Sequence, residues 1–182
     1  MNKFITILSR LPQWYGVAII VIYSVLLTEF LSEIYSILPS VSLGIFFEYM
    51  VNTSYIIAFL SGIITWIITI FVFHITALLF GGHSMFKEML LISSYFYIIQ
   101  IIAVIVSIFI LEDLTVINLI ELTDNPVYKL AQAVMDASFM LYYLFIVLLI
   151  NKIYCINLLR ATLSVFLPLG MIWGISILFD LI

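Results

Sequence analysis

Five long apolar stretches, separated by short polar segments, dominate the hydrophobic pattern of this 182-residue chain. A helix needs about 20 apolar residues to cross a hydrocarbon core about 30 Å thick. Backbone groups in lipid must be paired internally, and these stretches far exceed the ~10 alternating residues of a barrel strand, so we expect helices. The predicted spans cover residues 12–31, 55–80, 89–111, 131–150 and 161–178. The pattern therefore predicts an all-α membrane protein, a bundle of five transmembrane helices.

The segment between the first two spans, residues 32–54, fits no single assignment. It contains Pro39 and Gly44, yet residues 45–50 are too apolar for an ordinary exposed loop. A helix lying in the membrane interface would place such residues at the acyl boundary. An apolar loop packed on the bundle, or an extra short span that would change the topology, are the alternatives.

The composition supports a lipid environment, because 66% of the residues are hydrophobic and only 9% are charged. Soluble domains are nearer half apolar and a quarter charged. The net charge of −4 and the absence of a basic patch in the sequence argue against a nucleic-acid partner.

The few basic residues give the chain a predicted direction, because Lys and Arg favour the cytoplasmic side. With five spans, all but one of the 6 basic residues fall on the side of the N-terminus. We therefore expect an integral, multi-pass protein with its N-terminus in the cytoplasm and its C-terminus outside. The five residues on the N-terminal side are Lys3, Arg10, Lys87, Lys152 and Arg160.

Polar residues within the spans are few. Ser93, Gln100 and Ser107 are spaced by seven, so they share one helical face. Such a stripe normally packs against another helix and forms hydrogen bonds across the contact. A polar lining for a substrate path is the alternative. His74, in the second span, is either hydrogen-bonded to a neighbouring helix or part of a proton relay or ligand site.

Candidate chemistry is sparse. The two histidines and Cys155 have no recognised metal-ligand spacing. No Walker, Rossmann or G-x-S-x-G pattern occurs in the sequence. We therefore expect no enzyme, catalytic residue, metal or cofactor. Cys155 lies near the predicted cytoplasmic face, where acylation or simple packing are both open.

The most distinctive segment joins the second and third spans. Gly81 and Gly82 are expected to end the second helix, because glycine adopts the left-handed conformation of a helix C-cap. Ser84 is the expected N-cap of the third helix, with Lys87 and Glu88 in its first turn. The two spans should therefore form a tight helical hairpin with a short polar cytoplasmic tip.

This hairpin resembles the Yip-domain family, multi-span membrane proteins that interact with Ypt/Rab GTPases. Members carry a Gly-Gly or similar pair, a Ser-Phe-Lys/Glu-like step and a Tyr in the following span. The residues in those places are Gly81, Gly82, Ser84, Phe86, Lys87, Glu88 and Tyr95. Met85 separates Ser84 from Phe86, and Ile98-Ile99 stand where many members have a proline. A second similarity is the basic-Ala-apolar-Pro pattern of residues 158–168.

The resemblance implies a single Yip-like transmembrane domain over residues 1–182. The short segment before the first span resembles the prokaryotic members, which implies a prokaryotic cell membrane. A GTPase partner is implied by the resemblance only.

These observations favour a non-enzymatic scaffold or organiser of membrane or protein assemblies. Besides the lipid bilayer, we expect a membrane-protein partner or a homo-oligomer. The alternative is a small transporter or substrate-binding membrane subunit with a polar pocket around Gln100, to which His74 and Asn157 would contribute. A membrane enzyme has the least support, because no acid/base pair lies at an interface.

Overall fold

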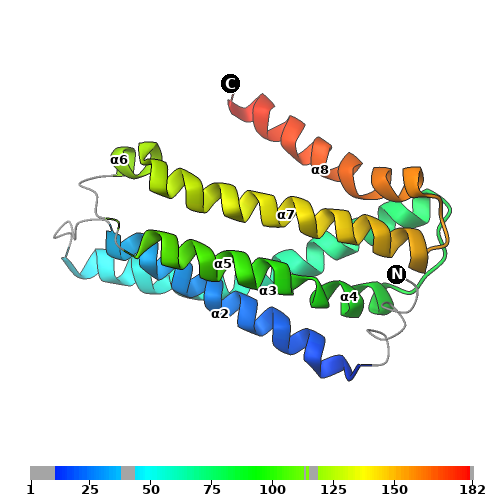
Figure 1. Cartoon of the computed structure of the whole chain (residues 1–182), viewed down its shortest axis with the longest axis horizontal. Coiled ribbons are helices and arrows are strands. Elements are labelled where there is room, and N and C mark those ends of the chain that lie inside the picture. Colours follow the sequence, from blue (N-terminus) through cyan, green and yellow to red (C-terminus); the bar gives the residue numbers. More distant parts are fainter. Residues whose placement is uncertain (1–10, 38–43, 113, 115–118, 181–182) are drawn as a thin grey trace. The chain divides into compact units, whose positions relative to one another are not determined.

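The computed structural model describes residues 11–37, 44–112, 114 and 119–180 (Figure 1). All regular secondary structure in these residues is helical. The helices are α2 (Gln13–Ile37), α3 (Gly44–Leu79), α4 (Phe86–Tyr95), α5 (Tyr97–Leu111), α6 (Leu119–Asp124), α7 (Pro126–Ile153) and α8 (Leu158–Asp180).

Four segments are long and apolar enough to cross a bilayer: Gln13–Ile34, Thr53–Leu79, Phe86–Leu111 and Pro126–Ile153. In α8 the shorter stretch Leu158–Gly174 is also apolar. The predicted all-α membrane fold is confirmed.

The chain forms two compact units. Among the described residues, the first unit comprises residues 11–17, 66–96 and 142–180. The second unit comprises residues 18–65 and 97–141, as far as these are described. Helices α2, α3 and α7 contribute residues to both units.

Helix α3 corrects the assignment of the segment between the first two spans. Residues 44–54 form neither a separate interfacial helix nor a loop, because they are the beginning of the 36-residue helix α3. At 1.5 Å per residue this helix is about 54 Å long. Even a tilt of 40° leaves it spanning about 41 Å, against a core of about 30 Å. Part of α3 must therefore extend beyond the hydrocarbon. Pro39 lies outside the described residues.

The third span begins at Phe86 rather than at Met89, and it is two helices rather than one. The interruption is at Phe96, whose N–H bonds to the Ser93 carbonyl at 3.1 Å. The Ser93 and Ser94 hydroxyls donate to carbonyls three residues earlier in their own helix, at 2.8 and 2.6 Å. Such back-bonding perturbs a helix, which gives the break a cause without a proline.

The fourth span begins five residues before its predicted start, at Pro126. The Asn125 side chain accepts a hydrogen bond from the Val127 N–H at 2.8 Å, so Asn125 is the N-cap and Pro126 occupies the first helical position. Just before it, α6 contributes Leu122 to a buried cluster with Leu111 of α5 in the second unit.

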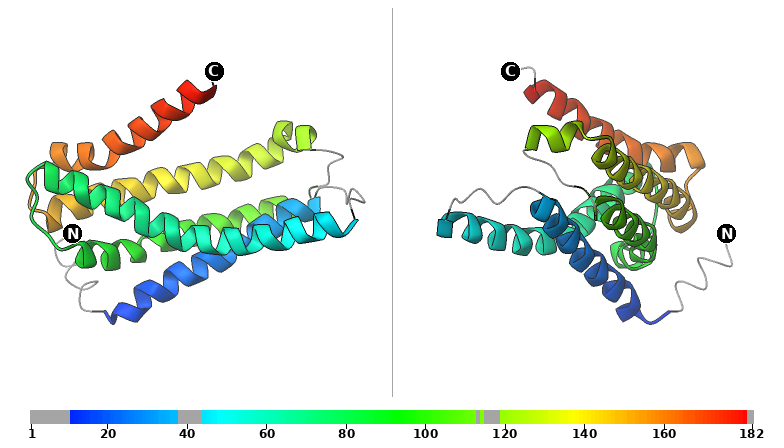
Figure 2. Two further views of the ribbon diagram at one scale, coloured as in Figure 1. Left: turned by 180° about the vertical axis from the view of Figure 1, so that it is seen from behind. Right: turned by 60° about the vertical axis from the view of Figure 1, so that its left-hand side comes forward.

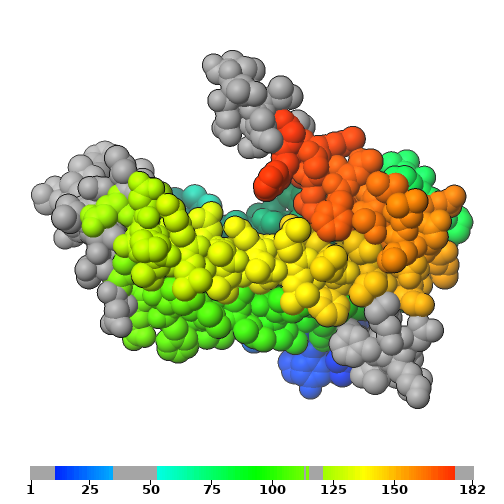
Figure 3. Space-filling model, turned by 45° about the horizontal axis from the view of Figure 1, so that its top comes forward, coloured from blue at the N-terminus to red at the C-terminus, as the bar shows by residue number. Residues whose placement is uncertain are grey.

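Helix α8 contains Pro168 within its length. Proline has no N–H, so the carbonyl of Ser164, four residues earlier, loses its partner within the helix. The Thr76 hydroxyl of α3 lies 2.6 Å from this carbonyl and donates to it. Residues 170–174 of α8 are exposed, as at Trp173 (74% exposed), and Figure 3 shows them in red at the surface.

Candidate functional site

The predicted hairpin turn is built around a helix C-cap. The N–H of Gly82 bonds to the carbonyl of Ala77 at 3.0 Å, and that of Gly81 bonds to Leu78 at 2.9 Å. This pair of bonds is the Schellman arrangement, with Gly81 at the left-handed position (φ 86°). The prediction that the two glycines end this helix is confirmed.

Gly82 has a different role, because it allows a close approach. A Cβ placed there would lie 2.7 Å from Cδ1 and 2.8 Å from Cβ of Tyr154. Tyr154 follows α7, and its carbonyl accepts a bond from the His83 N–H at 3.4 Å. The turn after α3 and the turn after α7 therefore lie side by side, as Figure 2 shows. We call this contact region, residues 80–85 and 154–157 with the side chains around Tyr154, the Tyr154 junction.

The Tyr154 side chain connects three helices of the first unit. Its hydroxyl is hydrogen-bonded to Nδ1 of His74 on α3. The same hydroxyl lies 3.1 Å from the sulfur of Met89 on α4. The His74 ring also packs against Phe86, with centroids 5.5 Å apart. His74 thus has the neighbouring partner that the packing interpretation requires.

Burial, and to a lesser degree the nearby Glu88 carboxylate, raise the pKa of Tyr154 well above its ordinary value. The phenol therefore keeps its proton at physiological pH. It can donate to His74 or to the weaker acceptor Met89, so the junction holds its geometry without a buried charge.

The charged tip differs in detail from its prediction. Ser84 is not the N-cap, because α4 begins at Phe86 and Met85 occupies that position without a side-chain cap bond. The Ser84 hydroxyl instead lies 3.5 Å from a carboxylate oxygen of Glu88. Lys87 and Glu88 are in the first turn, as predicted, and both side chains are exposed.

Asn157, which the transporter alternative assigned to a pocket around Gln100, and Arg160 complete the junction. The Asn157 side chain caps α8 by accepting a bond from the Arg160 N–H at 2.8 Å. The Arg160 guanidinium lies 3.4 Å from the Phe80 carbonyl at the end of α3, where a cation favours the helix dipole. An Asn three residues before Arg160 is an N-cap signal, but nothing in the sequence singles out Tyr154 from other interfacial tyrosines.

The polar stripe of the third span is buried in helix contacts. Ser93 accepts a bond from the Trp66 indole at 3.2 Å in the first unit. In the second unit, Gln100 accepts from Ser138 at 2.8 Å, and Ser107 donates to the Ala131 carbonyl at 3.2 Å.

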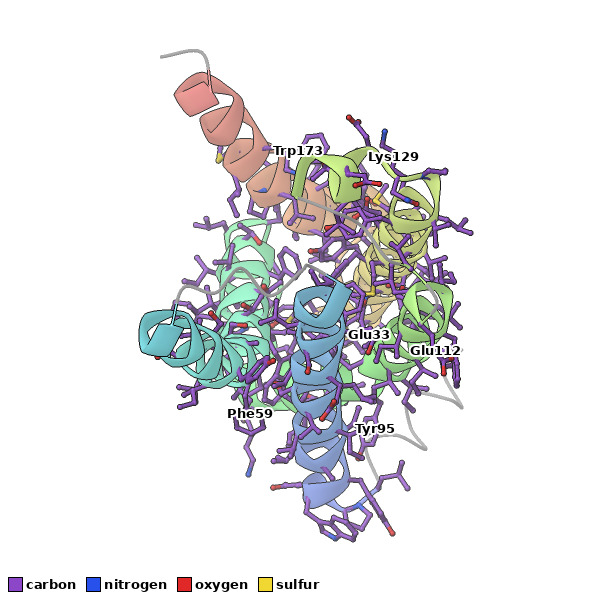
Figure 4. The ribbon with its side chains drawn as sticks, turned by 90° about the vertical axis from the view of Figure 1, so that its left-hand side faces the viewer. Glu33, Phe59, Tyr95, Glu112, Lys129 and Trp173 are labelled. Atoms are coloured by element: carbon purple, nitrogen blue, oxygen red, sulfur yellow. The ribbon has the colours of Figure 1, made fainter. Side chains whose placement is uncertain are left out.

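The side chain of Gln100 is fully buried, and its amide nitrogen has no partner among the described residues. Two open pockets lie elsewhere and are not lined by Gln100. One, in the first unit, has a volume of about 270 Å³. The other, in the second unit, measures about 350 Å³ and is lined by Phe59, labelled in Figure 4. Over the described ranges, no three His, Cys, Asp or Glu side chains gather in a metal-binding arrangement.

The sequence matches no family model, and neither a similar curated protein nor a similar solved structure was found. The apolar helices identify a membrane protein. Membership of the Yip-domain family remains a proposal that rests on the hairpin residues.

Proposed function

We propose that this protein is a non-enzymatic membrane scaffold that docks a membrane-protein partner, or a second copy of itself, at the Tyr154 junction. The observation that carries the proposal is that buried contacts connect the turns after α3 and α7, while the charged side chains next to these turns are exposed. Gly82, Tyr154 and His74 fix the backbone of the two turns. A surface of this kind offers a partner a preorganised shape at little entropic cost.

Four charged side chains beside the Tyr154 junction are available for such a partner. The side chains of Lys87, Glu88, Lys152 and Arg160 are all exposed. None of these four side chains forms an ion pair within the described residues, and the Lys129–Asp124 pair belongs to the second unit. Surface charges of both signs increase the specificity and the association rate of a complex more than its affinity. These properties are expected of a scaffold that binds its partner reversibly.

The proposed orientation places the junction in the cytoplasm, supported by the excess of basic residues on that side. The hairpin's resemblance to the Yip-domain family adds support for an organising role. A GTPase partner is supported by that resemblance alone. The transporter alternative needs a polar cavity at Gln100, and the bond from Ser138 supports a packing role there.

Cys155 makes the proposal testable without adding a reactive group, because it is exposed at the junction and is the only cysteine of the chain. A photo-reactive maleimide on Cys155 is activated in intact membranes, and cross-linked products are resolved by electrophoresis and mass spectrometry. The matched control carries the same probe at Phe109→Cys, a 70% exposed position in the second unit, in a Cys155→Ser background.

The expected result is one discrete product from Cys155, either the dimer or a complex with one membrane protein. Charge reversal at Lys87 or Arg160, which leaves Tyr154 in place, should reduce that product severalfold. The scaffold proposal fails if Cys155 yields only the diffuse background seen from Phe109→Cys, or if charge reversal changes nothing.

A further inference from the structure

The pocket of about 270 Å³ in the first unit lies where two spans begin. We call it the notch. Its lining comes from the start of α2 and from the whole length of α4, and it combines an apolar wall with two opposite charges. The residues that matter for its chemistry are Leu11, Gln13, Lys87, Glu88, Leu91 and Tyr95.

Close packing just below the notch holds its two walls together. A Cβ at Gly16 would lie 2.3 Å from the Ser94 hydroxyl, so α2 and α4 approach each other as closely as glycine allows. The Tyr95 hydroxyl lies 3.4 Å from the Pro12 carbonyl, and Figure 4 shows Tyr95 beside α2. The notch is therefore a fixed part of the helix contact rather than a gap between loose ends.

The position of the notch along the spans matches the headgroup level of a bilayer. Helices α2 and α4 both begin there, at Gln13 and Phe86. Trp14 and Tyr15 stack on each other at 4.0 Å and are exposed at the same end of α2. Paired exposed aromatic residues at the end of a span are typical of the membrane–water interface. Phospholipid headgroups are thus the molecules most concentrated at the mouth of the notch.

The charges of the notch select among those headgroups. Lys87 and Glu88 both line it, and within the described residues neither is in an ion pair. A cation and an anion side by side complement a zwitterion better than they complement an anion alone. The start of α4 has no side-chain cap, so the positive end of its helix dipole adds to the attraction of Lys87 for a phosphate.

We propose that the notch binds a phospholipid whose headgroup carries both a phosphate and a primary ammonium, the phosphatidylethanolamine class. The phosphate pairs with Lys87, the ammonium donates hydrogen bonds to Glu88, and an acyl chain lies along Leu11 and Leu91. A choline headgroup has no N–H to donate to Glu88. An anionic glycerol headgroup offers Glu88 neutral hydroxyl donors but no cationic group. The lipid contacts Lys87 and Glu88, which the scaffold proposal also offers to a protein partner, but lipid retention is measured without any partner.

The test is lipid retention in native mass spectrometry. The full-length protein in a mild, easily removed detergent is titrated with phosphatidylethanolamine, phosphatidylcholine or phosphatidylglycerol of identical acyl chains. Lys87→Gln, Glu88→Gln and the notch-filling Leu91→Trp are compared with two controls from the same unit. Lys152→Gln removes an exposed lysine elsewhere, and Leu159→Trp adds the same bulk at an exposed site. Circular dichroism confirms that each variant is folded.

We expect the ethanolamine lipid to bind about fivefold or more tightly than the other two, the worth of one charge-assisted contact. Lys87→Gln and Leu91→Trp should weaken the retention of all three lipids, because the phosphate and the acyl chains are common to them. Glu88→Gln should abolish the preference for the ethanolamine lipid, because it removes the carboxylate that the ammonium contacts. The controls should change neither.

Equal retention of the three lipids, or equal loss in the Lys152→Gln and Lys87→Gln variants, would overturn the proposal. Free phosphoethanolamine, added as a competitor at millimolar concentration, should leave the lipid bound. Its displacement of the lipid would mean that a soluble zwitterion, not a membrane lipid, is the occupant.

Discussion

Replacing Gly82 with alanine should destabilise the protein through a steric clash at the Tyr154 junction. The added Cβ would lie 2.7 and 2.8 Å from two atoms of Tyr154 and 2.9 Å from the Ala77 carbonyl oxygen. Ordinary carbon–carbon contacts are about 3.5–4.0 Å, so the two contacts with Tyr154 are about 1 Å too short. Two of the three atoms, a Cβ and a backbone oxygen, cannot turn away. We expect a loss of about 1–3 kcal/mol in the free energy of unfolding, the usual cost of overpacking.

Two other glycines serve as controls. A side chain meets no steric clash at either position, and the two differ in whether the backbone conformation requires glycine. At Gly170 a Cβ would have no neighbour within 4 Å, so Gly170→Ala should be neutral or stabilise α8 by up to about 1 kcal/mol. At Gly81 space is available, the nearest neighbour being 3.8 Å away, but φ is 86°. Gly81→Ala should therefore cost about 1–2 kcal/mol through backbone strain alone.

The assay is unfolding in mixed micelles by titration with sodium dodecyl sulfate, followed by circular dichroism. Gly82→Ala should lower the stability, whereas Gly170→Ala should leave it unchanged or raise it. If Gly82→Ala proves as stable as Gly170→Ala, the turns do not pack as described and the junction is not a rigid unit.

Three further outcomes follow from the same contacts. Thr76→Val should cost about 1–3 kcal/mol, because the Ser164 carbonyl loses its only replacement donor. The loss should shrink in a Pro168→Ala background, where the N–H of residue 168 returns, and an equal loss in both backgrounds would contradict this. The folded pKa of Tyr154 is raised above the unfolded value of about 10, so the unfolded chain releases its proton first and stability falls as the pH rises above about 10. Tyr154→Phe should remove a slope of at most about 1.4 kcal/mol per pH unit from stability measured between pH 9 and 11. Cys155 should react with a membrane-impermeant maleimide only after the cytoplasmic face is made accessible, and labelling from the outside would reverse the proposed orientation.

The helices could be predicted from the sequence because their signal is simple. Long apolar runs and the glycine pair at 81–82 depend on local chemistry, and the structure has a helix at each apolar run and ends α3 before the glycine pair. The errors fall where local signals compete. Residues 44–54 contain apolar, helix-compatible side chains after a glycine, and hydropathy alone does not say that a span continues into the interface. The start of α7 was placed too late because Asp124, Asn125 and Pro126 resemble a surface loop, although Asn125-Pro126 is also an N-cap signal.

Only part of the candidate site could be predicted from the sequence. Its glycines and charged tip are contiguous along the chain, so their pattern was detectable. Tyr154 lies 72 positions beyond Gly82 and 80 beyond His74, and no periodicity connects such residues. The break at Phe96 was missed for a similar reason. Serine back-bonding is a property of rotamers within a helix, and an apolar run conceals it.

The hydrogen bond from Thr76 to Ser164 has a consequence for how the chain is made. The two residues are separated by 88 positions, so α3 leaves the ribosome long before α8 does. When α8 enters the bilayer, the carbonyl exposed by Pro168 has no lipid group that can pair with it. Its insertion is therefore completed by docking against a helix that is already present. A chain truncated before α8 should still integrate its earlier helices, whereas α8 expressed alone should insert poorly unless residue 168 can donate an N–H.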